Sequence, residues 1–379
     1  MMAMRASRVL PVAAMSTMIL SGQEPQTSAL SEADNKLVPI AVVGAATLGY
    51  AAYRGMSKMQ SLDDRLGALE IKAAKAESSA FLFIKPHAVT DPVKDLVKKK
   101  LAEVGISIAS EGSIPGPEID KKMYIDSHYG AIAEKAVKLK PEQLTPSAKA
   151  KAEFEKTFGL SWSEALKRGL VYNAMDGCPK LGIDGDGLDQ KWSQLKRGVN
   201  LIKFGGGFYC GKVGEIFIIN GFYMSMRSKF TQPGTSIHYY LVEWPTSSLS
   251  WEDFRGKVLG TTNPNEAAAG SLRKIIAQDW QALGLTEPPN TGDNGVHASA
   301  SPFEALSERM NWCGVSADAD TYGKALLAAG VPLSTILKWT SDPQVNLPGG
   351  SKGSLFDALE DLDSDVCLTK SIQLSELNK

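Results

Sequence analysis

The stretch AFLFIKP, residues 80–86, is a short apolar run that ends in a lysine and a proline. Such a run predicts a buried strand with Lys85 at its end, and a rigid strand end is a suitable position from which to hold a phosphate. The segment that begins at Asp91 has apolar residues at helical spacing and predicts an amphipathic helix. A lone lysine is usually an ordinary solvated side chain, so the phosphate interpretation depends on segments farther along the chain.

Four such segments follow in order: HY (128–129), GTTNP (260–264), GSLR (270–273) and NGVHAS (294–299). Together with IKP at residues 84–86, they resemble the motifs of the nucleoside diphosphate kinase family. Each motif alone is weak, but five in the right order are specific. The resemblance extends over residues 80–131 and 216–313. It implies an α+β fold, a ferredoxin-like βαββαβ domain with an antiparallel four-stranded sheet.

His297 is the candidate nucleophile. A neutral imidazole is nucleophilic near pH 7, and phosphoryl transfer otherwise needs positioning and positive charge. The loop that holds His297 precedes SPFE (301–304), which is a capping box with proline at the first helical position. The backbone N–H groups of such a helix start favour anions, so the setting suits a histidine that accepts a phosphoryl group.

The resemblance also implies roles for other side chains. Glu308 would orient the imidazole, and Tyr129 would lie beside it. Phe222 or its neighbour Tyr223 would stack on the base, although core packing is an equal alternative for both rings. The side chains implied to bind the nucleotide are Lys85, Phe222, Thr262, Arg273 and Asn294.

Among these, Lys85 and Arg273 would supply positive charge and are expected to be solvated when no ligand is bound. Thr262 would donate its hydroxyl to a phosphate oxygen, and Asn294 would bind the ribose and the nucleophile. The expected partners are nucleoside tri- and diphosphates with Mg²⁺ as cofactor. No metal site made by the protein's own residues is expected.

The chain departs from the family pattern at four places. His87 stands where the family has an aspartate, and Gly256 stands where an arginine is expected, with Arg255 beside it. Ala300 replaces an acidic residue, and the stretch before Asn294 is longer than in the family. Two functions therefore stay open. One is a kinase that passes the terminal phosphate of a nucleoside triphosphate to a diphosphate through a phosphohistidine. The other is a structural subunit of an organellar membrane complex that kept the fold while its chemistry faded.

Composition narrows the class of protein. The chain has 379 residues, 43% of them hydrophobic, and a net charge of −1, which argues against a surface that coats nucleic acid. The four cysteines lie far apart and form no CxxC pair, so a zinc site or disulfide framework is not indicated.

Two regions have no counterpart in the family. Residues 132–215 form an insertion, predicted to be helical over 141–168 and then rich in turns. Its DGDG run at 184–187 has Leu188 where a calcium loop needs an oxygen ligand, so a capped turn is favoured. Residues 314–379 form an extension with short helices at 321–329 and 354–362, which either wraps the domain or docks a partner.

The N-terminal part reads as targeting and anchoring. Residues 1–36 begin without acidic side chains and with two arginines, which suits a mitochondrial or plastid presequence or a secretory signal. Residues 37–53 are seventeen uncharged residues, about 26 Å as a helix, and predict a single transmembrane pass. Residues 54–79 predict a linker helix or a docking helix. The expected surroundings are an organellar membrane and subunits of a larger membrane complex.

Overall fold

The computed structural model describes residues 64–379 except Gly206. The predicted targeting segment 1–36 and transmembrane segment 37–53 lie outside these residues. Among the helices that are described, none is both long and apolar enough to cross a membrane. Residues 64–76 are helical, in agreement with part of the predicted linker helix, and strand β1 (Glu77–Ile84) begins three residues before the predicted domain boundary at residue 80.

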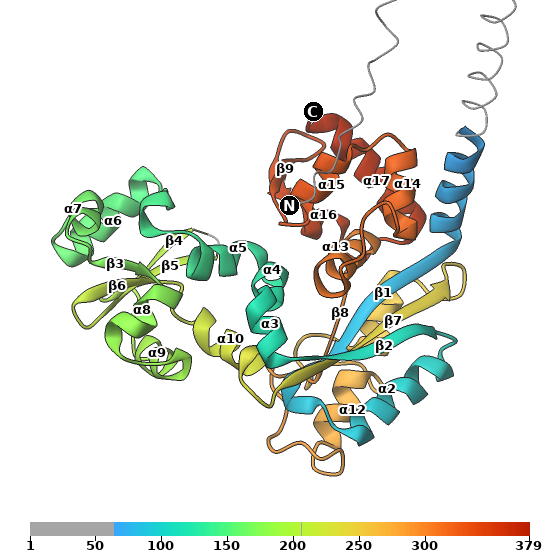
Figure 1. Cartoon of the computed structure of the whole chain (residues 1–379), viewed down its shortest axis with the longest axis horizontal. Helices are drawn as coiled ribbons and strands as arrows, with labels where there is room; N and C mark the ends of the chain where they lie inside the picture. The colour runs from blue at the N-terminus through green and yellow to red at the C-terminus, as the bar shows by residue number, and fades with distance from the viewer. Residues whose placement is uncertain (1–63, 206) are drawn as a thin grey trace, which may run out of the picture. The chain divides into compact units, whose positions relative to one another are not determined.

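The main sheet has four antiparallel strands in the order β2 (Ser107–Pro115), β7 (Ser236–Pro245), β1 and β8 (Val296–Ala298). Helix α2 (Asp91–Glu103) connects β1 to β2, and α12 (Leu272–Gln278) lies between β7 and β8 in the chain. The sheet has the four antiparallel strands predicted for a ferredoxin-like βαββαβ domain. Figure 1 shows α2 and α12 side by side against the same face of the sheet.

Strand β1 is buried on both faces of the sheet, and its successive side chains pack on one face and then the other. Ala80, Leu82 and Ile84 pack with apolar residues of α2 and α12, whereas Phe81 and Phe83 pack on the other face with Trp312. Trp312 belongs to α13 (Pro302–Cys313), which Figure 1 shows on the opposite side of the sheet from α2. A strand covered on both faces reads as an unbroken apolar run, which explains residues 80–84.

Other short helical elements between β1 and β8 in the chain are η3 (Pro86–Ala88), α3 (Gly116–Lys122), α4 (Tyr124–His128), α5 (Gly130–Ala133), η4 (Glu134–Lys138), α10 (Tyr223–Thr231), α11 (Trp251–Asp253) and η6 (Phe254–Leu259). Of these, α4 ends at His128 and contacts α13. The end of α4 therefore lies close to the face of the sheet that α13 covers.

The insertion forms a second sheet with its own core, in the strand order β3 (Val171–Asn173), β6 (Ile216–Ile219), β5 (Phe208–Val213) and β4 (Leu201–Gly205). The predicted end of the insertion at residue 215 is therefore wrong. The run IFII of β6 pairs with β3 and β5, and a short apolar run alone does not reveal which sheet it will join.

The insertion's predicted helical region is confirmed as η5 (Pro141–Gln143), α6 (Ala148–Phe158) and α7 (Trp162–Lys167). Two further helices follow, α8 (Ala174–Leu181) and α9 (Gly185–Trp192). The DGDG run is a capped turn, as expected, because the Asp184 side chain accepts a hydrogen bond from the Gly187 N–H at the start of α9.

The C-terminal extension packs on the domain. Its elements are α14 (Thr321–Ala328), α15 (Leu333–Trp339), β9 (Gln344–Asn346), β10 (Lys352–Ser354), α16 (Leu355–Leu359) and α17 (Ser364–Leu377). The predicted helices correspond to α14 and α16, whereas the others were not predicted. The extension shares a buried apolar cluster with Phe303 and Leu306 of α13. Of the two alternatives, wrapping the domain is therefore the one observed.

Candidate functional site

His297 lies on β8, the edge strand next to β1, and pairs with Phe83. Their rings are 4.8 Å apart between centroids, on the face of the sheet that α13 covers. The Lys85 N–H donates to the Gly295 carbonyl at 2.9 Å and continues the pairing. Because side chains alternate along a strand, the pairing directs Lys85 to the same face as Phe83 and His297.

Glu308 of α13 holds the imidazole, as the resemblance implied. His297 Nε2 is 2.6 Å from Glu308 Oε1, and the Ser299 hydroxyl is 2.5 Å from Glu308 Oε2. Ser299 is itself fixed by the Phe81 N–H, which donates to its Oγ at 3.0 Å. Since Glu308 engages Nε2, Nδ1 is the ring nitrogen left to act as a nucleophile.

Burial and nearby cations keep His297 neutral. Its pKa lies well below the usual value because the half-buried ring is largely removed from solvent and because Lys85 and Arg273 add positive charge nearby. Burial also raises the pKa of Glu308 to about 7. A neutral imidazole with an unprotonated nitrogen is the nucleophilic form, so the site favours the reactive state at neutral pH.

Lys85 and Arg273 differ in how free they are to meet a ligand. Lys85 is half-buried and donates from Nζ to the Gly292 carbonyl at 2.9 Å. Its pKa is lowered to about 8 by burial and by the charge of Arg273. A lysine that holds one exposed carbonyl can exchange it for a phosphate oxygen.

Arg273, by contrast, is only 8% exposed, so the expectation that it is solvated is wrong. Its Nη1 donates to the Gly260 carbonyl at 2.7 Å, and Nε and Nη2 donate to the Val296 carbonyl at 3.2 and 3.1 Å. Since β8 is an edge strand, its Val296 carbonyl, which points away from β1, has no neighbouring strand to donate to it. A buried carbonyl needs a hydrogen-bond donor, and Arg273 supplies one. Arg273 therefore positions the strand that carries His297.

Asn294 and Thr262 lie together at the border of this site. The Asn294 side chain is buried and donates from Nδ2 to the Thr262 carbonyl at 3.0 Å and to the Thr291 carbonyl at 3.4 Å. Its Oδ1 is buried without a hydrogen-bond partner. The Thr262 side chain is exposed. The contact joins the GTTNP and NGVHAS segments and leaves one amide oxygen to accept a hydrogen bond.

The Tyr129 ring packs on His128 and on Tyr223, with centroids 5.1 and 6.1 Å apart. His128 lies beside the candidate nucleophile, with its ring 4.6 Å from that of His297 and edge-on to it. The HY motif indicated this segment, but the motif gave His128 itself no role.

Phe222 packs within the insertion, with ring centroids 6.1 Å from Trp192 and 5.9 Å from Tyr209. It belongs to the apolar cluster that includes Leu188 and Ile218. The insertion supplies aromatic partners for this ring, which is partly buried against them.

The departures from the family pattern have structural roles. The Gly295 N–H donates to His87 Nε2 at 3.1 Å, and burial lowers the pKa of His87 to about 4. Arg255 of η6 forms ion pairs with Glu360 and with Asp361, the latter at 2.8 Å. The C-terminal extension thus supplies two carboxylates to the arginine beside the site.

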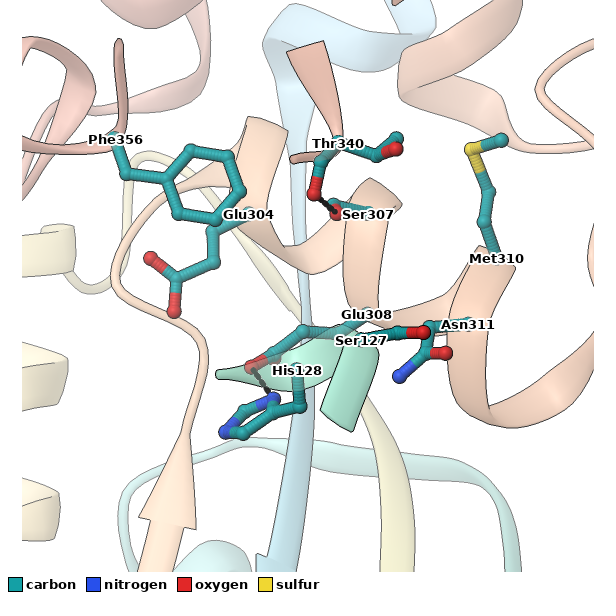
Figure 2. Close-up of a pocket in the computed structure, with 9 residues that line it drawn as sticks. All are labelled: Ser127, His128, Glu304, Ser307, Glu308, Met310, Asn311, Thr340 and Phe356. Atoms are coloured by element: carbon teal, nitrogen blue, oxygen red, sulfur yellow. Dashed lines mark hydrogen bonds and ion pairs between the residues drawn. The ribbon is translucent and has the colours of Figure 1, made fainter. Parts of the chain in front are cut away.

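A cavity of about 320 Å³ reaches this site from the side of the extension. Figure 2 shows the Glu308 carboxylate and the His128 imidazole meeting at its base, with Glu304 nearby and Thr340 and Phe356 on the far wall. The other lining residues are Ser127, Ser307, Met310 and Asn311. The cavity gives small molecules and ions access to the buried carboxylate.

No family model matches the chain, and no curated protein matches it in sequence. Among solved structures, it is similar to the nucleoside diphosphate kinase from Encephalitozoon cuniculi, with 14% identity and a TM-score of 0.30 over 64% of this chain and 92% of that one. It is also similar to the NDP kinase from Pyrobaculum aerophilum, with 15% identity and a TM-score of 0.30 over 62% of this chain and 95% of that one. Likeness at this level does not assign the chain to a family.

Proposed function

We propose that this protein moves the terminal phosphate of a nucleoside triphosphate to a nucleoside diphosphate through a phosphohistidine at His297. The proposal rests on the protonation, the hydrogen bond and the electrostatic surroundings of the His297 side chain. His297 is neutral, held at Nε2 by Glu308, and influenced by the positive charges of Lys85, Arg273 and Arg255. Phosphoryl transfer depends mainly on positioning and electrostatic stabilisation, which are the properties of this arrangement.

In the first half of the reaction, the Nδ1 lone pair of His297 attacks the terminal phosphorus. The N–P bond forms while the bond to the bridging oxygen breaks, and the nucleoside diphosphate leaves with that electron pair. The ring gains positive charge as the bond forms, and Glu308 stabilises it by accepting the Nε2–H. In the second half, a terminal oxygen of another diphosphate attacks the phosphorus. The O–P bond forms while the N–P bond breaks, and the electron pair returns to Nδ1, so that His297 becomes neutral again.

We propose that the nucleotide arrives as its Mg²⁺ complex, since Mg²⁺ in such sites is held mainly by substrate phosphates. Lys85 would meet the phosphate oxygens by exchanging its hydrogen bond with Gly292. The Asn294 Oδ1, buried and without a partner, would accept a hydrogen bond from a ligand hydroxyl. Arg273 acts through the backbone of β8 in this scheme.

The test is direct labelling. The full-length chain is incubated with ATP that carries a labelled terminal phosphate, and we expect acid-labile, base-stable label on the protein, as for a phosphoramidate. Substitution His297→Ala should abolish the label, while the control His238→Ala, a histidine within β7, should retain it. Addition of unlabelled GDP should then move the label to GTP.

Nucleotide binding without labelled protein at any time point would refute the kinase. It would instead favour the alternative of a subunit that binds nucleotide without transferring phosphate.

A further inference from the structure

His128, His297 and Glu308 come from three different elements, α4, β8 and α13, and converge on one point. One possible ligand atom from each residue lies within 4.8 Å of the other two. Glu308 Oε1 is 2.6 Å from His297 Nε2 and 3.3 Å from His128 Nδ1. We propose that these three side chains bind a divalent transition metal ion of the zinc type, at a site that includes the candidate nucleophile.

The distances fit such an ion after side-chain movements of up to about 1.5 Å, the most by which the two imidazole nitrogens, within 4.8 Å of each other, would have to approach. Bonds of about 2.0–2.1 Å in a tetrahedral site place ligand atoms about 3.3 Å apart. The separation between His128 and Glu308 already has this value. The hydrogen bond between His297 and Glu308 would open by about 0.7 Å to admit the ion. The ring proton then moves from Nε2 to Nδ1, because the nitrogen that binds the metal must be unprotonated while a neutral imidazole keeps one N–H.

The surroundings also suit a bound metal. Ser299 Oγ is 2.5 Å from Glu308 Oε2, which leaves Oε1 to face the two imidazoles. Such a hydrogen bond to a ligating carboxylate orients it and strengthens a metal site. The cavity in Figure 2 is lined by Glu308 and His128 and has room for a water molecule as fourth ligand.

The ligand set favours zinc-like ions over Mg²⁺. Two imidazole nitrogens and one carboxylate suit Zn²⁺, Co²⁺ or Ni²⁺, whereas Mg²⁺ prefers oxygen ligands in octahedral geometry. This site therefore differs from the Mg²⁺ that we propose to enter with the nucleotide.

Metal binding has a consequence that rests on the proposed function. Glu308 and the metal compete for the same nitrogen, Nε2 of His297. A carboxylate on Nε2 raises the electron density of the ring, whereas a metal ion withdraws it. A metal ion at this site would therefore suppress phosphorylation of His297 at Nδ1.

The first experiment measures metal binding without nucleotide. The full-length chain, freed of metal with a chelator, is titrated with Co²⁺ and then with Zn²⁺. We expect the visible absorption bands of four-coordinate Co²⁺, lost when Zn²⁺ displaces it. His128→Ala should weaken binding by at least about tenfold, while the control His238→Ala should bind as the wild type does. Absence of the bands, or equal binding by His128→Ala, would overturn the site.

A second measurement needs no variant and so does not depend on whether His128→Ala folds. X-ray absorption of the wild-type Zn²⁺ complex should show two imidazoles and low-atomic-number oxygen ligands around the metal. One imidazole or none would overturn the three-residue site.

A third measurement separates this inference from the kinase. Equimolar Zn²⁺ should reduce the labelling of His297 by at least tenfold, and a chelator should restore it. Full labelling of the Zn²⁺-saturated chain would show that the metal does not occupy Nε2 and would overturn the site. If no label forms under any condition, the kinase fails, while the Co²⁺ titration still decides the metal site.

Discussion

Substitution His87→Gln should change how the stability of the protein depends on pH. The Gly295 N–H donates to His87 Nε2 at 3.1 Å, so this nitrogen must be unprotonated in the folded chain. Burial, opposed by the nearby charge of Asp293, lowers the pKa of His87 from 6.5 to about 4. A glutamine can accept the same hydrogen bond through its side-chain oxygen but has no proton to gain.

The sign and size of the effect follow from these two pKa values. Below pH 6.5 the unfolded chain takes up a proton at His87, and the folded chain does not until about pH 4. The wild type therefore loses stability as the pH falls through this window, by about 1.4 kcal/mol per pH unit from this one residue. Relative to the wild type, the variant should gain about 2 kcal/mol between pH 8 and pH 5.

The measurement is urea unfolding of the full-length chain at pH 8, 7, 6 and 5, followed by tryptophan fluorescence. At pH 8 the two proteins should differ little, since both retain an acceptor for the Gly295 N–H and neither side chain is charged. The difference in free energy of unfolding should then grow steadily towards pH 5. Curves that stay parallel over this range would refute the neutral, hydrogen-bonded state of His87.

Three further predictions concern the site and the anchor. Glu308→Gln should slow labelling of His297 by about 100-fold, because an amide does not fix the tautomer that leaves Nδ1 free; an unchanged rate would exclude the orienting role. Asp361→Asn should tighten nucleotide binding several-fold in a calorimetric titration, because it removes a carboxylate that competes with phosphate for Arg255; an equal Kd would mean that Arg255 does not meet the nucleotide. Residues 37–53 should hold the full-length chain in the pellet of a carbonate-washed membrane fraction, and its recovery in the supernatant would contradict the single-pass anchor.

Contacts between residues far apart in the chain determine which sheet a strand joins and which side chains an aromatic ring meets, and the motifs do not reveal either. The run IFII of β6 has the same pattern as a strand of the main sheet, yet its backbone pairs with β3 and β5 of the insertion. Phe222 has the character of a base-stacking ring but meets Trp192 and Tyr209. In each case several partners are chemically equivalent, and only the folded chain determines which one is reached.

Some features of the site follow from local sequence patterns, whereas others depend on contacts between residues far apart in the chain. The sequence by itself determined the apolar strand that ends at Lys85 and the capped helix after His297, because periodicity and capping act between near neighbours. The pair of His297 and Glu308 was implied by the resemblance of the motifs. Only the tertiary structure placed His128 against both of these residues and directed the guanidinium of Arg273 to backbone carbonyls. Those contacts join residues far apart in the chain, so they depend on how the strands and helices pack and not on any local pattern.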